Sequence, residues 1–160
     1  MEKKITVEYE VLDHSDKLTD QEKNLFEIAE KQMELAYAPY SNFYVGAAIL
    51  LDNGAVIPGS NQENAAYPLC MCAERVALYS AITQYPQGKG VKMAIVANNP
   101  HLKVDKPIPP CGSCRQVILE FENRFERPLE ILLKDDFGKY YRFKSCRQLL
   151  PLAFDGSFLQ

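Results

Sequence analysis

Histidine is scarce in this sequence of 160 residues, and its scarcity limits the metal sites that the chain can build. Only His14 and His101 are present, and they lie far apart. A zinc helix of the His-Glu-x-x-His type needs two histidines one helical turn apart, and a three-histidine centre needs a third one. Any transition-metal site must therefore be built mainly from cysteine thiolates, which are soft ligands.

Long apolar segments, an apolar leader and glycosylation sequons are also missing. The longest apolar stretch, Val45–Leu51, is far shorter than the roughly 18 residues that cross a bilayer. The start, Met1–Lys4, does not lead into an apolar leader core. The chain has five cysteines, an odd number that does not suit a secreted disulfide scaffold. We expect a soluble cytoplasmic protein with reduced thiols.

Charge of neither sign dominates. Lysine and arginine number 18 against 21 aspartates and glutamates, which gives a formal net charge of −3. The basic residues form no stripe along the sequence, so the chain has no general attraction for phosphate backbones or anionic membranes. We therefore expect no nucleic acid and no membrane among its partners.

The amino-terminal segment has the pattern of a strand. Ile5, Val7, Tyr9 and Val11 alternate with polar residues, which is the period of a half-buried strand. The length of the chain fits one domain of about 100–200 residues. We expect residues 1–18 to form an N-terminal strand or arm, followed by a single domain over residues 19–160.

Three segments after the arm have helical spacing. Thr19 and Glu22 form a capping box before the first, which is predicted to reach about residue 37. The second runs from about Cys72 to Gln84, and the third follows Cys111. Ser145 is placed to cap a short final helix.

Strand patterns alternate with these helices. Two hairpins are expected across the turn sequences Asp52–Gly54 and Asp135–Gly138. The predicted strands cover residues 44–51, 55–58, 92–97, 129–134 and 140–143. Such an alternation indicates an α/β fold, namely a three-layer α/β/α sandwich with a mixed central sheet.

Three cysteines stand at the starts of two predicted helices. Cys72 opens one helix, and Cys111 and Cys114 open the other. The free N–H groups and the positive dipole end of a helix lower the pKa of a thiol and favour the thiolate that binds metal. Three thiolates on Zn²⁺ leave the fourth tetrahedral position open for water, as in catalytic centres. Glu74 is placed to lie beside that water and to move its proton without being a ligand.

These residues carry a resemblance to a known family. Cys72–Arg75 and Pro110–Gln116 resemble the all-cysteine zinc site of the small cytidine deaminases. Further segments resemble the same family in the same order, so the resemblance covers roughly residues 20–154: Ala38–Ala48, Asn61–Tyr67 and Leu149–Phe154.

The resemblance implies a cytidine deaminase-like fold and a zinc-dependent hydrolytic deaminase. Its reaction would convert cytidine and deoxycytidine to uridine and deoxyuridine with release of ammonia, in pyrimidine salvage. One Zn²⁺ per chain would be held by Cys72, Cys111 and Cys114, with Glu74 as the proton shuttle. Arg75, hydrogen-bonded to the sulfurs, would offset the negative charge that three thiolates bring to zinc.

The resemblance also implies a nucleoside site and an assembly. Asn61 and Glu63 would bind the ribose hydroxyls, for which an amide and a carboxylate offer donors and acceptors. Phe43 would pack on the pyrimidine ring, and the backbone of Ala73 would contact the base. The small-molecule nucleoside would be bound in a homotetramer whose subunit contacts complete the sites through two more substrate-binding residues, Tyr67 and Phe154.

Some features depart from the family or leave alternatives open. Pro109 stands where many relatives have serine, and Cys70 forms a Cys-x-Cys pair with Cys72, which allows a four-thiolate structural zinc. Cys111 and Cys114 alone would also suit a redox pair. Another free cytosine-type compound such as blasticidin is an alternative substrate. We expect Cys70 and Cys146 to be small buried residues.

Overall fold

A mixed six-stranded sheet forms the centre of the computed structural model, which describes residues 1–103 and 105–159. The strand order is β1-β6-β5-β4-β2-β3; β4 and β5 are parallel, and the other neighbouring pairs are antiparallel. The strands are Glu10–Leu12 (β1), Tyr44–Leu51 (β2), Val56–Ser60 (β3), Gly90–Asn98 (β4), Glu130–Lys134 (β5) and Tyr140–Phe143 (β6).

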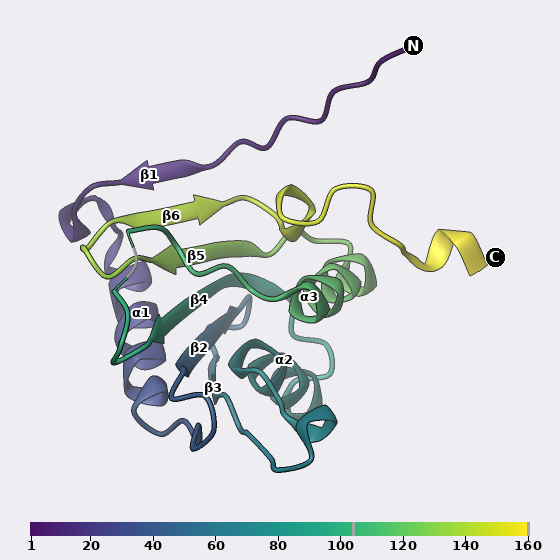
Figure 1. Cartoon of the computed structure of the whole chain (residues 1–160). Helices are drawn as coiled ribbons and strands as arrows, with labels where there is room; N and C mark the ends of the chain where they lie inside the picture. Colours follow the sequence, from purple (N-terminus) through teal and green to yellow (C-terminus); the bar gives the residue numbers. More distant parts are fainter. Residues whose placement is uncertain (104, 160) are drawn as a thin grey trace.

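Helices cover both faces of this sheet. Helix α1 (Asp20–Met33) lies on one face, and α2 (Ala73–Gln84) and α3 (Gly112–Phe125) lie on the other (Figure 1). The predicted three-layer sandwich is therefore confirmed. The short 3-10 helices are η1 (Ser15–Lys17), η2 (Tyr67–Leu69), η3 (Cys146–Gln148) and η4 (Gly156–Leu159). No helix within the described residues has the length and apolar character of a membrane span.

Alternation along the central strands divides the core into two layers. Ala48 and Leu50 of β2 face α1, whereas Ala47 and Ile49 of the same strand face α2 and α3. Both sets are buried, as expected for a sheet that is covered on each side. The seven-residue apolar stretch noted in the sequence is therefore a central strand.

Two glycines let the helices sit directly on the sheet. A Cβ built on Gly46 in β2 would lie 1.9 Å from the carbonyl oxygen of Ala29 in α1. A Cβ on Gly59 in β3 would lie 2.5 Å from the carbonyl oxygen of Ala73, the first residue of α2. No side chain fits at such distances, so glycine is required where these backbones meet.

Two predicted elements are shorter than their sequence patterns. The first helix ends at Met33, because Tyr37 leaves it to exchange backbone hydrogen bonds with the segment 61–63. The N-terminal strand pairs only over Glu10–Leu12, because its partner β6 ends at Phe143. Ile5 and Val7 are exposed beyond that pairing.

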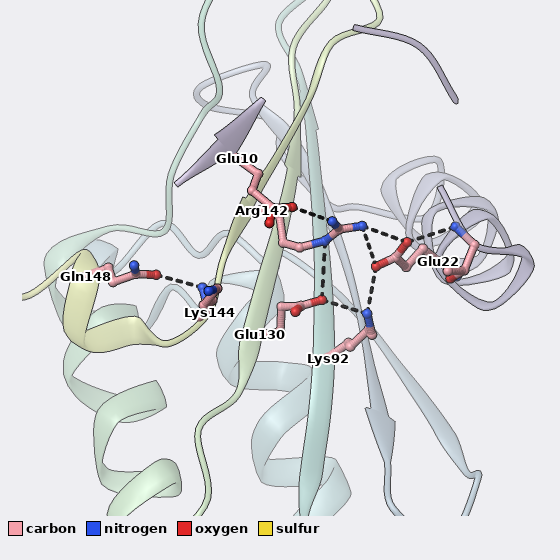
Figure 2. A network of polar contacts seen from close by, with 8 residues as sticks. Glu10, Glu22, Lys92, Glu130, Arg142, Lys144 and Gln148 are labelled. Atoms are coloured by element: carbon pink, nitrogen blue, oxygen red, sulfur yellow. Dashed lines mark hydrogen bonds and ion pairs between the residues drawn. The ribbon is translucent and has the colours of Figure 1, made fainter. Parts of the chain in front are cut away.

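An ion cluster joins α1 to four strands (Figure 2). The fully buried side chain of Glu22 pairs with Lys92 of β4 at 2.7 Å and with Arg142 of β6 at 3.0 Å. Glu130 of β5 pairs with Lys92 at 2.7 Å, and Glu10 of β1 pairs with Arg142. The cluster thus fastens the N-terminal arm to the edge of the sheet.

The charge of Glu22 makes the stability of the folded protein depend on pH. Burial opposes its ionisation, but hydrogen bonds from Lys92 and from the backbone of Thr19 outweigh burial and lower its pKa from 4.5 to about 2. Because the folded pKa is below the ordinary value, ionised Glu22 stabilises the fold above about pH 4.5, and this contribution is lost as the pH falls towards 2.

We therefore expect Glu22→Gln to be less stable than the wild type at pH 7, by an amount that shrinks as the pH falls below 4.5. The amide keeps an acceptor for the N–H of Thr19 but leaves Lys92 and Arg142 short of one negative partner. Urea unfolding of both proteins at several pH values measures the difference. A difference that stays constant with pH would contradict this account of Glu22.

Candidate active site

Three thiols meet where α2 and α3 begin. Cys72 is the N-cap of α2, Cys111 is the N-cap of α3, and Cys114 lies in the first turn of α3. Their sulfur atoms lie within 4.8 Å of one another; Cys72 and Cys111 are 3.9 Å apart, and Cys111 and Cys114 are 3.5 Å apart. The fold therefore brings together the three predicted ligands, although Cys72 and Cys111 are 39 residues apart in the sequence.

The spacing of these sulfurs fits zinc. A tetrahedral centre with Zn–S bonds of about 2.3 Å places its sulfurs roughly 3.8 Å apart, between the two distances observed. All five cysteines are free in the structure. Three soft thiolates and no imidazole form a donor set that suits zinc.

Cys70 does not complete a four-thiolate centre. The metal-competent cluster among the described residues contains Cys72, Cys111 and Cys114, whereas the sulfur of Cys70 accepts a hydrogen bond from the backbone N–H of Asn64 at 3.2 Å. Cys70 is also half-buried in the cavity wall, so its prediction as a buried residue is wrong. Cys146 is fully buried, as predicted.

Hydrogen bonds within the cluster favour a thiolate. The contact with the Cys114 thiol is the largest effect that lowers the pKa of Cys72, to about 5, against the opposing effect of burial. Arg75 adds to it, with Nη2 3.6 Å from the sulfur of Cys72. The same contact with Cys72, together with burial, raises the pKa of Cys114. Arg75 therefore lies against the sulfur of Cys72, and its role in offsetting the charge of the thiolates stays a prediction.

Glu74 lies beside the thiols but does not belong to the cluster that could hold a metal ion. It is in the first turn of α2, is only 4% exposed, and lines the same cavity as Cys72 and Cys111. Burial raises the pKa of its carboxyl. A carboxyl that is easier to protonate than usual suits an acid–base group that must both accept and deliver a proton.

The cavity has a volume of about 230 Å³. It lies where β2 begins and β4 ends, next to the first turns of α2 and α3. Six of the predicted site residues line it: Phe43, Asn61, Glu63, Cys72, Glu74 and Cys111. Ala73, the residue after Cys72, is fully buried.

Asn61 and Glu63 also build the wall of this cavity. The side-chain amide of Asn61 donates to the carbonyl of Phe43 at 2.9 Å and accepts from the N–H of Val45 at 2.8 Å. Glu63 accepts from the backbone N–H groups of Tyr40 at 2.8 Å and Ser41 at 3.3 Å. A hydrogen bond from the Ser41 side chain is the main cause that lowers the pKa of Glu63. Amide and carboxylate oxygens accept more than one hydrogen bond, so these side chains can hold the loop and bind a ligand together.

Two predicted residues lie outside this cavity within the single chain. Tyr67 is 69% exposed, with its ring edge against Tyr40, and borders a neighbouring hollow that also includes Glu63. Phe154 is 57% exposed and stacks on Phe158. The fold of one chain does not bring them to the thiols, so their role in the site stays a prediction.

Other lining residues were not predicted from the sequence. Ser41, Met71 and Ile108 all border the cavity, and Pro109 lies beside Ile108 in its wall. In the sequence, Pro109 is a departure from the family pattern that could alter contacts to the edge of the base. Ile108 has no chemical signal in the sequence, and only its place just before the Pro-Cys motif could have suggested it.

Comparisons with known proteins agree on one family. A family model described as the cytidine and deoxycytidylate deaminase zinc-binding region matches residues 19–125. A cytidine deaminase from Sporosarcina psychrophila is 44% identical over 139 residues, which cover 84% of this chain and 91% of that protein. A probable cytidine deaminase from Dictyostelium discoideum is 39% identical over 127 residues, which cover 79% of this chain and 78% of that protein.

The solved structures give the same result. The crystal structure of cytidine deaminase from Burkholderia pseudomallei has a TM-score of 0.73 and 42% identity, and the match covers 86% of this chain and 100% of that chain. A structure of cytidine deaminase from Mycobacterium tuberculosis has a TM-score of 0.66 and 34% identity, and the match covers 86% of this chain and 98% of that one.

Proposed function

Because the chain belongs to the cytidine and deoxycytidylate deaminase family, a family of zinc-dependent hydrolytic enzymes, we propose that it converts cytidine and deoxycytidine to uridine and deoxyuridine. One observation carries the proposal most directly: Glu74 lines the same cavity as Cys72 and Cys111, two members of the cluster of three thiols. A structural zinc module needs the thiols but has no use for a buried carboxyl beside them.

In the proposed reaction, a bond forms between C4 of the base and the oxygen of water, and the bond from C4 to its amino group breaks to release ammonia. Zinc, when it is held by Cys72, Cys111 and Cys114, lowers the pKa of a water molecule so that it can attack near neutral pH. Glu74 takes the first proton of that water at its carboxyl oxygen and delivers it to the ring nitrogen N3. It then takes the proton of the new hydroxyl on C4 and delivers it to the departing amine.

The remaining cavity residues hold the nucleoside. Phe43 packs on the pyrimidine ring, and the backbone of Ala73 contacts the base. Asn61 and Glu63 bind the ribose hydroxyls from the wall of the cavity. Arg75 offsets the negative charge of the thiolates, which would otherwise make the water a weaker acid.

Ammonia release is the direct test of this function. The protein is assayed with cytidine, deoxycytidine, cytosine, blasticidin, adenosine and a single-stranded oligonucleotide, each with and without a zinc chelator. We expect turnover of the first two and its loss on chelation. If blasticidin outcompetes cytidine, the antibiotic is the substrate instead. If none of the compounds is deaminated, the proposal is refuted.

We further propose that the enzyme is a cytoplasmic homotetramer that serves pyrimidine salvage. Large apolar side chains are exposed near the site and at the tail, more than a monomer of this size usually leaves in water: Tyr67, Leu69, Leu152, Phe154, Phe158 and Leu159.

Light scattering is expected to give four times the 18.2 kDa of one chain. Phe154→Ala should weaken assembly and activity together, because its ring would lie at a shared contact. Phe137→Ala removes another exposed ring, from the β5–β6 turn, and serves as the control. A fully active monomer would show that these side chains serve no assembly.

A further inference from the structure

We propose that Arg115 is a positioning residue for the metal site: it holds the backbone that leads into Cys111 and ties it to the C-terminal segment 145–154. The proposal rests on the proposed zinc ligands. It concerns a side chain outside the cluster, which bonds backbone carbonyl groups and not a ligand sulfur. The observation that carries it is a pair of short hydrogen bonds from one guanidinium.

Arg115 bridges two carbonyl groups from distant parts of the chain. Its Nε donates to the carbonyl oxygen of Pro110 at 2.7 Å, and its Nη1 donates to that of Leu149 at 2.8 Å. Pro110 directly precedes the ligand Cys111, and Leu149 lies 34 residues beyond Arg115, at the end of η3. The backbone N–H of Arg115 also donates to the carbonyl of Cys111 at 2.9 Å. One residue therefore holds the carbonyl before the ligand and the carbonyl of the ligand itself.

Both bridged carbonyls lie where the regular backbone offers no donor. Pro110 is buried and precedes the N-cap of α3, so its carbonyl is outside the helical hydrogen-bond series. Leu149 is the C-cap of η3, whose last carbonyls also have no helical partner. A buried carbonyl without a donor is costly, so losing Arg115 should let the loop before Cys111 move to find one.

The shape of the arginine side chain explains why this residue type is needed. A guanidinium is planar and presents its N–H donors in a fixed fork, so two carbonyls can be held in a fixed relation. A lysine carries one compact ammonium on a flexible stem and does not reproduce that geometry. We therefore expect Arg115→Lys to keep the charge and to lose the positioning.

The two thiol-bearing helix starts are thus supported in different ways. Arg75 reaches the sulfur of Cys72 and the carbonyl of Cys70 from within α2. Arg115 instead fixes the backbone on either side of the Cys111 α-carbon. Cys111 is the exposed member of the cluster, whereas Cys114 is buried. The position of Cys111 therefore depends on its own loop more than the position of Cys114 does.

The C-terminal segment 145–154 contacts the same turn of α3 through two further hydrogen bonds. The thiol of Cys146 donates to the carbonyl of Arg115 at 3.3 Å, and the side chain of Gln116 donates to the carbonyl of Phe154 at 2.9 Å. Arg115 is the member of this group that also touches the ligand loop. A change in the tail can therefore reach Cys111 through it.

Zinc release to a chelator tests the proposal without relying on activity. We compare the wild type, Arg115→Gln and Arg115→Lys, with Arg124→Gln as a control that removes the same charge from the exposed side of the same helix. Unfolding temperatures are measured with zinc bound and after its removal. Substitution with Co²⁺ adds a spectroscopic readout, because the thiolate bands report ligand geometry.

We expect both Arg115 variants to release zinc about 10–100-fold faster, the range typical for residues that orient metal ligands, while Arg124→Gln matches the wild type. The unfolding-temperature gap between zinc-bound and zinc-free protein should narrow in both, and the cobalt bands should shift in Arg115→Lys even if Arg115→Gln folds poorly. Wild-type release rates, or an equal loss of stability with and without zinc, would overturn the proposal. A wild-type chain that binds no zinc would instead refute the ligand set, and the role of Arg115 with it.

Discussion

Glu74→Gln is expected to keep one zinc ion per chain and the wild-type fold while turnover falls by about 10²–10⁴-fold, the usual contribution of a general acid–base group. The amide is nearly the same size as the carboxyl, so it fits the buried place that Glu74 occupies at 4% exposure. It cannot accept the proton of water or deliver one to the base. Metal analysis and ammonia release on the same sample measure both quantities.

Cysteine variants provide the contrast for this experiment. Cys72→Ala should lose the metal as well as the turnover, because it removes one of three thiols in the cluster. Cys70→Ala is the matched control, since its sulfur bonds the backbone of Asn64 and should leave the zinc content unchanged. Near-normal deamination by Glu74→Gln would refute the proton shuttle, and loss of zinc from Cys70→Ala would revive the four-thiolate alternative.

Glu63→Gln is expected to lower kcat/KM for cytidine by about 5- to 150-fold, because it removes the charge that strengthens a hydrogen bond to the sugar. The variant keeps an acceptor for the backbone N–H groups of Tyr40 and Ser41, so the loop should stay in place. What it loses is the charge and the second acceptor that would face the sugar.

The matched substrate is 2′,3′-dideoxycytidine, which has the same base but no hydroxyls on carbons 2′ and 3′ of the sugar. Glu63→Gln should change its kcat/KM little, because the contact that the substitution removes was never made. Equal losses on both nucleosides would show that Glu63 acts by shaping the cavity and not by binding ribose. Glu34→Gln, an exposed charge beyond the end of α1, controls for net charge.

The parts of the site that follow from residue type and helix starts were predictable from the sequence. Cys72, Cys111 and Cys114 could be grouped because a helix N-terminus stabilises a thiolate. The structure brings their sulfurs together. Glu74 could be placed beside them because two residues of helix separate it from Cys72. Both arguments use only local geometry and the chemistry of the donor atoms.

The parts that depend on distant partners were not predictable. The first helix ends early because of a pairing between Tyr37 and the segment 61–63, and the arm pairs briefly because β6 is short. The two hydrogen bonds of Asn61 to the start of β2 and the link from Arg115 to Leu149 join residues 16–18 and 34 positions apart. The periodicity or motif of one segment does not indicate which backbone N–H and carbonyl groups of a distant segment lack a hydrogen-bond partner.

The contact at Gly59 limits how this cavity could change in evolution or by design. The backbone of α2 rests directly on β3 there, so the helix start that carries Cys72 and Glu74 cannot move any closer to the sheet. Room for a bulkier base is more readily made at Ile108 and the exposed Pro109, which line the cavity from a connecting loop. Libraries that seek new amino-heterocycle substrates should therefore vary that loop and leave the helix untouched.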